Sequence, residues 1–117
     1  MTTLSIDTLT QRLRDFAAER DWDQYHSPKN LAMALTVEAA ELQEIFQWLT
    51  EAQASQLSPA DHQHAAEEIA DVLLYLLRLA DKLGIDVLQA AVDKMQKNAL
   101  KYPVETAKGS SKKYSAS

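Results

Sequence analysis

Cysteine is absent from this 117-residue sequence. Its absence excludes disulfide bonds, thiolate metal sites and cysteine nucleophiles, and it favours a reducing compartment. Glycine occurs only twice, whereas 46% of the residues are hydrophobic and 25% are charged. This balance is typical of a globular helical protein rather than of a disordered or fibrous one. We therefore expect an all-α fold.

Long apolar runs and an excess of positive charge are also missing. The longest apolar stretch, IADVLLYLLRLA, is too short to span a bilayer and is interrupted by Asp71 and Arg78. Asp7 lies where a signal peptide would have an apolar segment. The formal net charge is −5, and we find no basic stripe suited to a phosphate backbone. We expect a soluble cytoplasmic protein that binds neither a membrane nor a nucleic acid polymer.

Apolar residues recur with helical periodicity in four segments. A chain of this length builds one hydrophobic core, so we expect a single domain over residues 1–103 and a polar tail over residues 104–117. The predicted helices cover approximately residues 6–20, 28–49, 58–83 and 86–101. Together they predict a four-helix-bundle protomer.

Acidic residues lie on or beside the apolar faces of the second and third predicted helices. On the second helix, Glu38 falls in the middle of the leucine stripe and Glu41 at its edge. On the third helix, Glu68 flanks the apolar stripe and Asp71 lies just beyond it. That third stripe consists of Ala65, Ile69, Val72, Leu76, Leu79 and Leu83.

Carboxylates in such positions must be neutralised by protonation, by a basic partner or by a metal, because an isolated buried charge is costly. No lysine or arginine shares the two stripes. Carboxylates from neighbouring helices offer only oxygen ligands, which suit a hard divalent cation, and Mg²⁺ is the usual one where phosphate oxygens also bind. We therefore predict a magnesium site formed by Glu38, Glu41, Glu68 and Asp71.

Three other interpretations of the acidic pairs remain open. An acidic pair three residues apart is most often a solvated helix face. A carboxylate-bridged di-iron or di-manganese bundle is the second, although such sites use Glu-x-x-His on two helices, whereas the second pair here ends in Asp71. A non-catalytic, oligomeric helical scaffold is the third.

The order of the motifs resembles that of the all-α, MazG-like nucleoside triphosphate pyrophosphohydrolases. A Glu-x-x-Glu motif at residues 38–41 and a Glu-x-x-Asp motif at residues 68–71 match the signature of that family. The resemblance extends over approximately residues 16–114 and is strongest with the branch that acts on dCTP. The segments that carry it are ERDWDQYHSPKNLAMAL, EAAELQEIFQW, EEIADVLLYLL and KNALKYP.

The resemblance implies an activity and a set of site residues. The activity is Mg²⁺-dependent hydrolysis of a (deoxy)nucleoside triphosphate, dCTP or a modified dCTP, between the α and β phosphates, as in nucleotide-pool sanitation. The four acids would be both metal ligands and catalytic residues. The residues expected to bind the nucleotide are Trp22, His26, Lys29, Asn30, Trp48, Tyr75, Lys97, Asn98, Lys101 and Tyr102.

Most of the expected nucleotide contacts also have a purely structural explanation. Trp22, Trp48 and Tyr75 are also suited to packing, which is the commoner role of a lone tryptophan. Lys29 and Asn30 are equally suited to capping the second helix, and the lysines near residue 100 complement the negative end of a helix dipole. We expect the three histidines to be surface or local-network residues, and His26 to be the one that matters for the site.

The third helix is apolar nearly all round, because Leu73, Leu74 and Leu77 lie outside its main stripe. A helix of this kind needs cover on every side, which a four-helix monomer of this length does not readily supply. We therefore expect a homo-oligomer. The resemblance likewise implies a homodimer or homotetramer with active sites near the interface.

Overall fold

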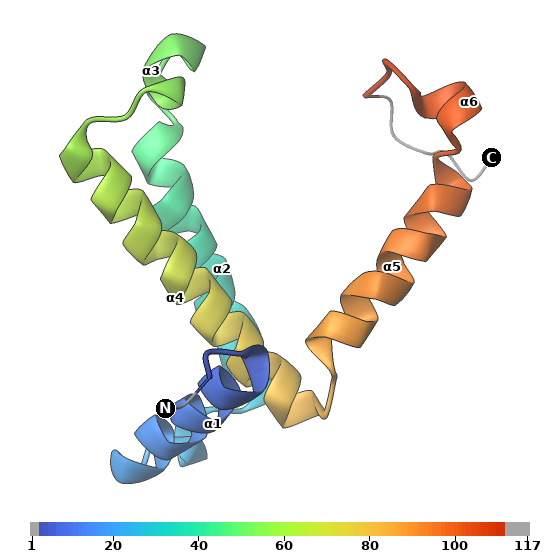
Figure 1. Ribbon diagram of the computed structural model, residues 1–117. Helices are drawn as coiled ribbons and strands as arrows, with labels where there is room; N and C mark the ends of the chain where they lie inside the picture. Colours follow the sequence, from blue (N-terminus) through green and yellow to red (C-terminus); the bar gives the residue numbers. More distant parts are fainter. Residues whose placement is uncertain (1–2, 112–117) are drawn as a thin grey trace. The chain divides into compact units, whose positions relative to one another are not determined.

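A computed structural model describes residues 3–111, and every regular element in this range is a helix (Figure 1). The all-α prediction is thereby confirmed. The elements are α1 (Ile6–Glu19), the 3₁₀ helix η1 (Asp23–Tyr25), α2 (Pro28–Phe46), α3 (Glu51–Ser55), α4 (Pro59–Leu83), α5 (Val87–Lys101) and α6 (Val104–Ala107).

The four predicted helices correspond to α1, α2, α4 and α5, with ends that differ by at most three residues. Three short helices were not predicted, namely η1, α3 and α6, the last of which begins the segment expected to be a polar tail. The helices form two compact units, Met1–Gly84 and Ile85–Ser117. The single domain over residues 1–103 stays a prediction, and the end of the family resemblance, near residue 114, lies outside the described residues.

Local capping fixes where the two long helices begin. The Ser27 hydroxyl accepts a hydrogen bond from the Asn30 amide, and Pro28 occupies the first turn of α2. Ser58 and Pro59 start α4 in the same way. Such caps satisfy amide groups that have no partner within the helix, and a proline in the first turn loses no hydrogen bond. These starts set the rotational positions of the side chains further along α2 and α4.

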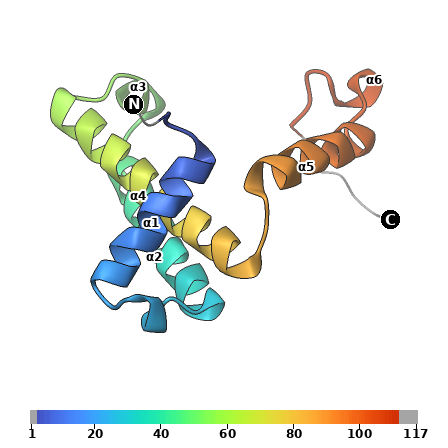
Figure 2. The same cartoon turned by 60° about the horizontal axis from the view of Figure 1, so that its bottom comes forward.

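In the first unit, α2 and α4 lie side by side along most of their lengths, and α1 lies across α4 (Figures 1 and 2). The buried apolar residues are small at several contact points, which lets the helix backbones approach closely. They are Ala17, Leu31, Ala65, Leu77 and Ala80. Helix α3 belongs to the connection from α2 to α4 and lies at one end of this helix pair.

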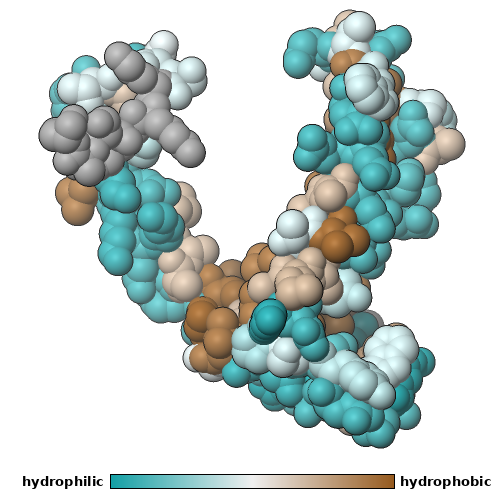
Figure 3. Space-filling view, turned by 180° about the vertical axis from the view of Figure 1, so that it is seen from behind, coloured by the Kyte–Doolittle hydropathy of each residue, from teal (hydrophilic) through white to brown (hydrophobic). Residues whose placement is uncertain are grey.

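The predicted core face of α4 is partly wrong. Leu77, which we placed outside the main stripe, is only 2% exposed, whereas Ile69 and Leu76 from the predicted stripe are 57% and 41% exposed. Because the helix is apolar nearly all round, periodicity alone did not distinguish the face that meets α1 and α2 from the face left uncovered. Figure 3 shows brown, apolar side chains at the surface mainly around the C-terminal part of α4.

The second unit consists of α5 and α6. Asp86 caps α5 by accepting a hydrogen bond from the Gln89 amide. One side of α5 is apolar, with Leu88, Val92 and Met95 all at least half exposed. Among residues 3–111, no helix combines the length and the apolar character that a membrane span requires.

Leu31 provides a test of the packing in the first unit. It is 1% exposed and is the largest fully buried side chain among the described residues, so Leu31→Ala should lower the free energy of unfolding by about 2–5 kcal/mol through lost burial and a residual cavity. Leu4→Ala makes the same chemical change at a residue that is 80% exposed. Its midpoint in urea denaturation should stay close to wild type, and equal losses in the two variants would contradict this packing.

Candidate metal centre and the adjoining pocket

Three of the four predicted metal ligands come together between α2 and α4. One carboxylate oxygen from each of Glu38, Glu41 and Glu68 lies within 4.8 Å of the other two. Glu38 and Glu68 are half-buried, while Glu41 is exposed. Asp71 is half-buried but does not belong to this group of oxygens, although its charge acts on Glu38. The cluster therefore has a shielded side and a side that is open to solvent.

The environment of Glu38 disfavours its ionised form. Burial is the largest cause, followed by a hydrogen bond with Glu41 and by the negative charges of Glu41, Asp71 and Glu68, and together they raise the pKa of Glu38 to about 7. A carboxylate that repels its neighbours in this way is stabilised by a proton or by a cation that the group shares.

Two oxygen atoms in the cluster lack any partner. The Oε2 atoms of Glu38 and Glu68 are buried, and neither accepts a hydrogen bond from the residues that the structure describes. Buried polar atoms without partners are rare in folded proteins, and they often mark the place of an ion or a water. A set made of carboxylate oxygens alone fits a hard divalent cation. The residues present thus fit the predicted metal in their chemistry and in their unsatisfied atoms.

A histidine borders the cluster. The Nε2 atom of His64 lies 3.4 Å from an oxygen of Glu68, one turn further along α4, and the His64 side chain is 55% exposed. This agrees with its expected role in a local network. The described part of the chain brings no lysine or arginine within 4 Å of the Glu38, Glu41 or Glu68 carboxylates.

A pocket of about 240 Å³ includes Asp71 in its lining but none of the three clustered glutamates. It lies between α1, the segment around η1 and α4, and Asp71 is the member of the acidic motifs that reaches it. Its walls are largely apolar and aromatic, with a few polar groups, as is common for small-molecule sites. The residues that line it are Leu13, Phe16, Ala17, Trp22, His26, Asp71, Leu74, Tyr75 and Arg78.

An aromatic group forms one wall of this pocket. The rings of Phe16 and Trp22 meet edge to face with centroids 5.7 Å apart, and the Trp22 and His26 ring centroids are 6.5 Å apart. Arg20 stacks on Phe16, its guanidinium carbon 3.6 Å from the ring centroid. Trp22 remains 44% exposed, so part of its ring is free to contact a flat ligand.

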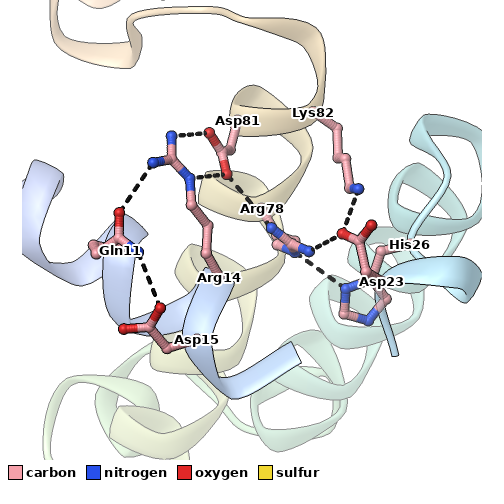
Figure 4. Close-up of polar contacts among 8 residues, drawn as sticks. All are labelled: Gln11, Arg14, Asp15, Asp23, His26, Arg78, Asp81 and Lys82. Atoms are coloured by element: carbon pink, nitrogen blue, oxygen red, sulfur yellow. Dashed lines mark hydrogen bonds and ion pairs between the residues drawn. The ribbon is translucent and has the colours of Figure 1, made fainter. Parts of the chain in front are cut away.

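Arg78 in the pocket wall was missed by the sequence analysis as a site residue. It is 6% exposed, and no other charged residue in the described part of the chain is buried. Figure 4 shows its guanidinium group between Asp23, His26 and Asp81. The available signal was a single arginine inside an apolar run, which we interpreted as an interruption rather than as a buried group in need of partners.

Two further ion pairs hold the partners of Arg78. Arg14 on α1 donates two hydrogen bonds to Asp81, of 2.8 and 2.5 Å, and Lys82 donates one to Asp23. These contacts lower the pKa of both aspartates, chiefly through the hydrogen bonds from Arg14 and Lys82. The η1 segment is thereby tied to α4, which places Trp22 and His26 along the pocket.

The charge of His26 is also influenced by this network. Burial and then the positive charges of Arg78 and Lys82 lower the pKa of His26, against an opposing effect of Asp23. The ring is therefore neutral near pH 7. Its Nδ1 atom accepts a hydrogen bond from the Arg78 Nε–H group at 3.1 Å.

Three of the predicted nucleotide contacts in the first unit lie away from this pocket. Trp48 follows the end of α2 and is 87% exposed. Lys29 and Asn30 are in the first turn of α2, where the Asn30 side chain donates to the carbonyl of Tyr25 at 3.0 Å. None of the three lines the described pocket, whereas Trp22, His26 and Tyr75 do.

The remaining predicted contacts belong to the second unit. Lys97, Asn98 and Lys101 are on α5, and Tyr102 is its C-terminal cap, with its amide donating to the carbonyl of Asn98. Their placement within α5 agrees with the predicted helix. Their role in nucleotide binding stays a prediction.

Comparison with known proteins gives consistent matches. The sequence is 44% identical to dCTP pyrophosphatase 1 of Rattus norvegicus and of Homo sapiens over 112 residues, which is 94% of this chain and 66% of those proteins. The chain thus spans just under two thirds of the length of these relatives. The crystal structure of a pyrophosphatase from Archaeoglobus fulgidus superposes with a TM-score of 0.81 at 41% identity, covering 88% of this chain and 96% of the other.

A profile of the MazG-like family matches residues 33–116. This range includes both acidic motifs and ends beyond the described residues. It also covers well over half of the sequence, so the family resemblance found in the motifs is confirmed. The chain belongs to the MazG-like family.

Proposed function

We propose that this protein is a metal-dependent nucleoside triphosphate pyrophosphohydrolase. The observation that carries the proposal is the group of three carboxylates whose oxygens lie within 4.8 Å, two of them with a buried atom that has no partner. Such a group has no evident structural use, because its members repel each other. The relatives named dCTP pyrophosphatase 1 and the pyrophosphatase from Archaeoglobus fulgidus support the same activity.

In the proposed reaction, water attacks the α phosphorus and the bond to the β-phosphate oxygen breaks, so that the products are a nucleoside monophosphate and pyrophosphate. Glu38, Glu41 and Glu68 would hold the cation, and Asp71, at the boundary with the pocket, would complete the set. When bound, a divalent cation supplies positive charge that offsets the charge of the phosphate oxygens. We propose Mg²⁺ for this role because the donor set is made of carboxylate oxygens.

The pocket beside the acids is the proposed place of the nucleobase. Its volume of about 240 Å³ and its aromatic wall, with Trp22 partly open, suit a flat ring. The names of the mammalian relatives support dCTP as the substrate. A modified dCTP is the alternative that we propose from the family resemblance. Lys29, Asn30, Trp48 and the four predicted residues of the second unit stay proposed nucleotide contacts, and none of them lines this pocket.

A homodimer or homotetramer is part of the proposal. Ile69, Leu73 and Leu76 follow one another at four- and three-residue spacing on α4 and are 57%, 39% and 41% exposed. This spacing puts them on one face of the helix. A second copy of the chain would cover that face. The cytoplasmic location expected from the sequence stays a prediction.

The activity is tested with a panel of nucleoside triphosphates in the presence of Mg²⁺, with pyrophosphate and orthophosphate measured separately. We expect pyrophosphate as the product, with dCTP among the best substrates. Orthophosphate as the sole product would contradict cleavage between the α and β phosphates, and the absence of hydrolysis across the panel would contradict the proposed function.

Substitution of one acid tests the role of the cluster. Glu68→Gln keeps the shape of the side chain but removes its charge, and it should lower kcat/KM by at least about 100-fold, because even the outer partners of metal ligands contribute 10- to 100-fold. Glu67→Gln makes the same change at the preceding, exposed residue of α4 and should retain activity. Equal rates for the two variants would exclude Glu68 from the site.

The raised pKa of Glu38 predicts a pH-dependent stability that a metal should reverse. Without metal, the folded protein keeps Glu38 protonated up to about pH 7, whereas the unfolded chain ionises it near 4.5. Its favourable contribution is thus present below the unfolded value and is lost as the pH rises through about 7. Relative to wild type, Glu38→Gln should therefore gain thermal stability as the pH rises from about 5 to about 8.

The exposed Glu44 on the same helix provides the control for this measurement. Glu44→Gln should follow the wild-type melting temperature at each pH, since Glu44 lies outside the cluster. Added Mg²⁺ should raise the melting temperature of wild type above pH 7 more than that of Glu38→Gln, because binding to the folded state alone stabilises it. Parallel pH curves for wild type and Glu38→Gln would show that Glu38 is not destabilised by its neighbours.

Assembly is tested by the exposed face of α4. Ile69→Asp places a charge where the proposed contact needs an apolar side chain, and it should reduce the molar mass measured by light scattering from that of an oligomer to that of a 13.1 kDa monomer. Gln63→Asp is a control elsewhere on the exposed surface of α4. A wild-type protein that is already monomeric would contradict the proposed assembly.

A further inference from the structure

Arg78 has three different partners, and one of them is a histidine ring in the pocket wall. Its Nη2 group donates to Asp23 at 2.5 Å, its Nη1 group to Asp81 at 3.4 Å, and its Nε group to the Nδ1 atom of His26 at 3.1 Å. The side chain of Arg78 is only 7% exposed. A buried guanidinium group whose three nitrogens all have acceptors has little freedom to turn.

The hydrogen bond to His26 determines where the imidazole carries its proton. An arginine side chain is always protonated in proteins and has no acceptor, so each of its N–H groups can only donate. The Nδ1 atom of His26 must therefore present a lone pair to Arg78. In a neutral ring the proton then lies on Nε2, at the far side of the imidazole.

The Nε2 atom is available to a ligand. Within residues 3–111 it makes no hydrogen bond, while His26 itself lines the pocket together with Trp22 and Tyr75. The lowered pKa of His26 agrees with a neutral ring near pH 7. An N–H group without a protein partner, beside an aromatic wall, is suited to a ligand that offers a hydrogen-bond acceptor in the plane of a ring.

We propose that Arg78 is a positioning residue that holds His26 as the Nε2–H tautomer, so that the pocket presents a fixed donor to an acceptor on the edge of the nucleobase. The acceptor is a carbonyl oxygen or an unprotonated ring nitrogen. This inference rests on the proposed function for the identity of the ligand, but the state of His26 does not depend on it. A base that offers only N–H groups at this point leaves the donor unpaired and is disfavoured.

Substitution of Arg78 is compatible with folding, because its acidic partners keep other cations. Asp81 retains Arg14, and Asp23 retains Lys82. Arg78→Met keeps a side chain of similar length in the pocket wall and removes the donor to His26. Arg78→Lys keeps the charge but cannot present three donors in a fixed fork. Either variant therefore removes the hydrogen bond to His26 while α4 stays folded.

The first test is nuclear magnetic resonance of the whole protein labelled with ¹⁵N-histidine, without any ligand. In wild type, His26 should show an unprotonated Nδ1 and a protonated Nε2, and in Arg78→Met the ring should become a mixture of the two neutral tautomers. A proton on Nδ1 in wild type, or the same tautomer in both proteins, overturns the proposal. The result stands whatever the protein hydrolyses.

The second test measures hydrolysis of dCTP with Mg²⁺. It compares loss of the donor, the Nε2–H group of His26, with loss of Arg78, which holds that ring. Asparagine can keep an acceptor near the Nδ1 position but has no donor at the Nε2 position, whereas Arg78→Met keeps the imidazole and removes its anchor. Both His26→Asn and Arg78→Met should raise KM by about tenfold, the value of one hydrogen bond, with a smaller change in kcat. An unchanged KM in either variant overturns the proposal.

The double variant shows whether Arg78 acts through His26. If it does, Arg78→Met combined with His26→Asn should raise KM no more than the larger single effect, because both changes remove the same contact. Effects that multiply would show that Arg78 supports the pocket independently of His26, and this too overturns the proposal. If wild type hydrolyses no nucleoside triphosphate of the panel, the proposed function fails, while the tautomer measurement still decides the role of Arg78.

Discussion

Repulsion between carboxylates at the contact of α2 and α4 is the constraint on which the site depends. Two helices that pack closely normally place apolar or small residues between them, and here they also bring Glu38, Glu41 and Glu68 together. Burial, and after it the hydrogen bond and the negative charges of the neighbouring acids, raise the pKa of Glu38 to about 7. The packed helices thus hold the acids at separations that the acids themselves resist. A positive charge bound at this place would relieve that repulsion.

The pocket is built differently from the acidic cluster. Its wall is held by a network of opposite charges, in which Arg78 and Lys82 of α4 fix Asp23 of η1, and Arg14 of α1 fixes Asp81. In the acidic cluster charge is left uncompensated, whereas in this network each charge has a partner. The first arrangement suits binding of an ion, and the second suits the rigid positioning of aromatic and imidazole rings.

Much of this organisation follows from local sequence patterns. The four long helices were predicted because apolar periodicity and end signals such as Ser58, Pro59 and Gly84 are short-range features. Glu38 and Glu68 could be selected because an acid in a leucine stripe is costly and needs a reason. The short helix α3 was missed, although Thr50 and Gln53 form a capping box that marks its start.

Other features depend on contacts that are distant in sequence. The partners of Arg78 include Asp23 and His26, which are more than 50 residues away, so no local pattern indicates the network. The covered face of α4 was predicted incorrectly because leucines surround the helix, and only the positions of α1 and α2 decide that Leu77 is buried and Ile69 is not. The position of Asp71 at the pocket rather than among the three clustered oxygens likewise depends on packing.

The two parts of the site are built on supports of unequal length. The acids are carried by the interiors of α2 and α4, of 19 and 25 residues, whereas Trp22 and His26 flank a single 3₁₀ turn of three residues. Substitutions or insertions in so short a connection leave the two long helices intact. During divergence, substitutions in this connection can therefore change what the pocket accepts, while the two helices that carry the acids stay the same.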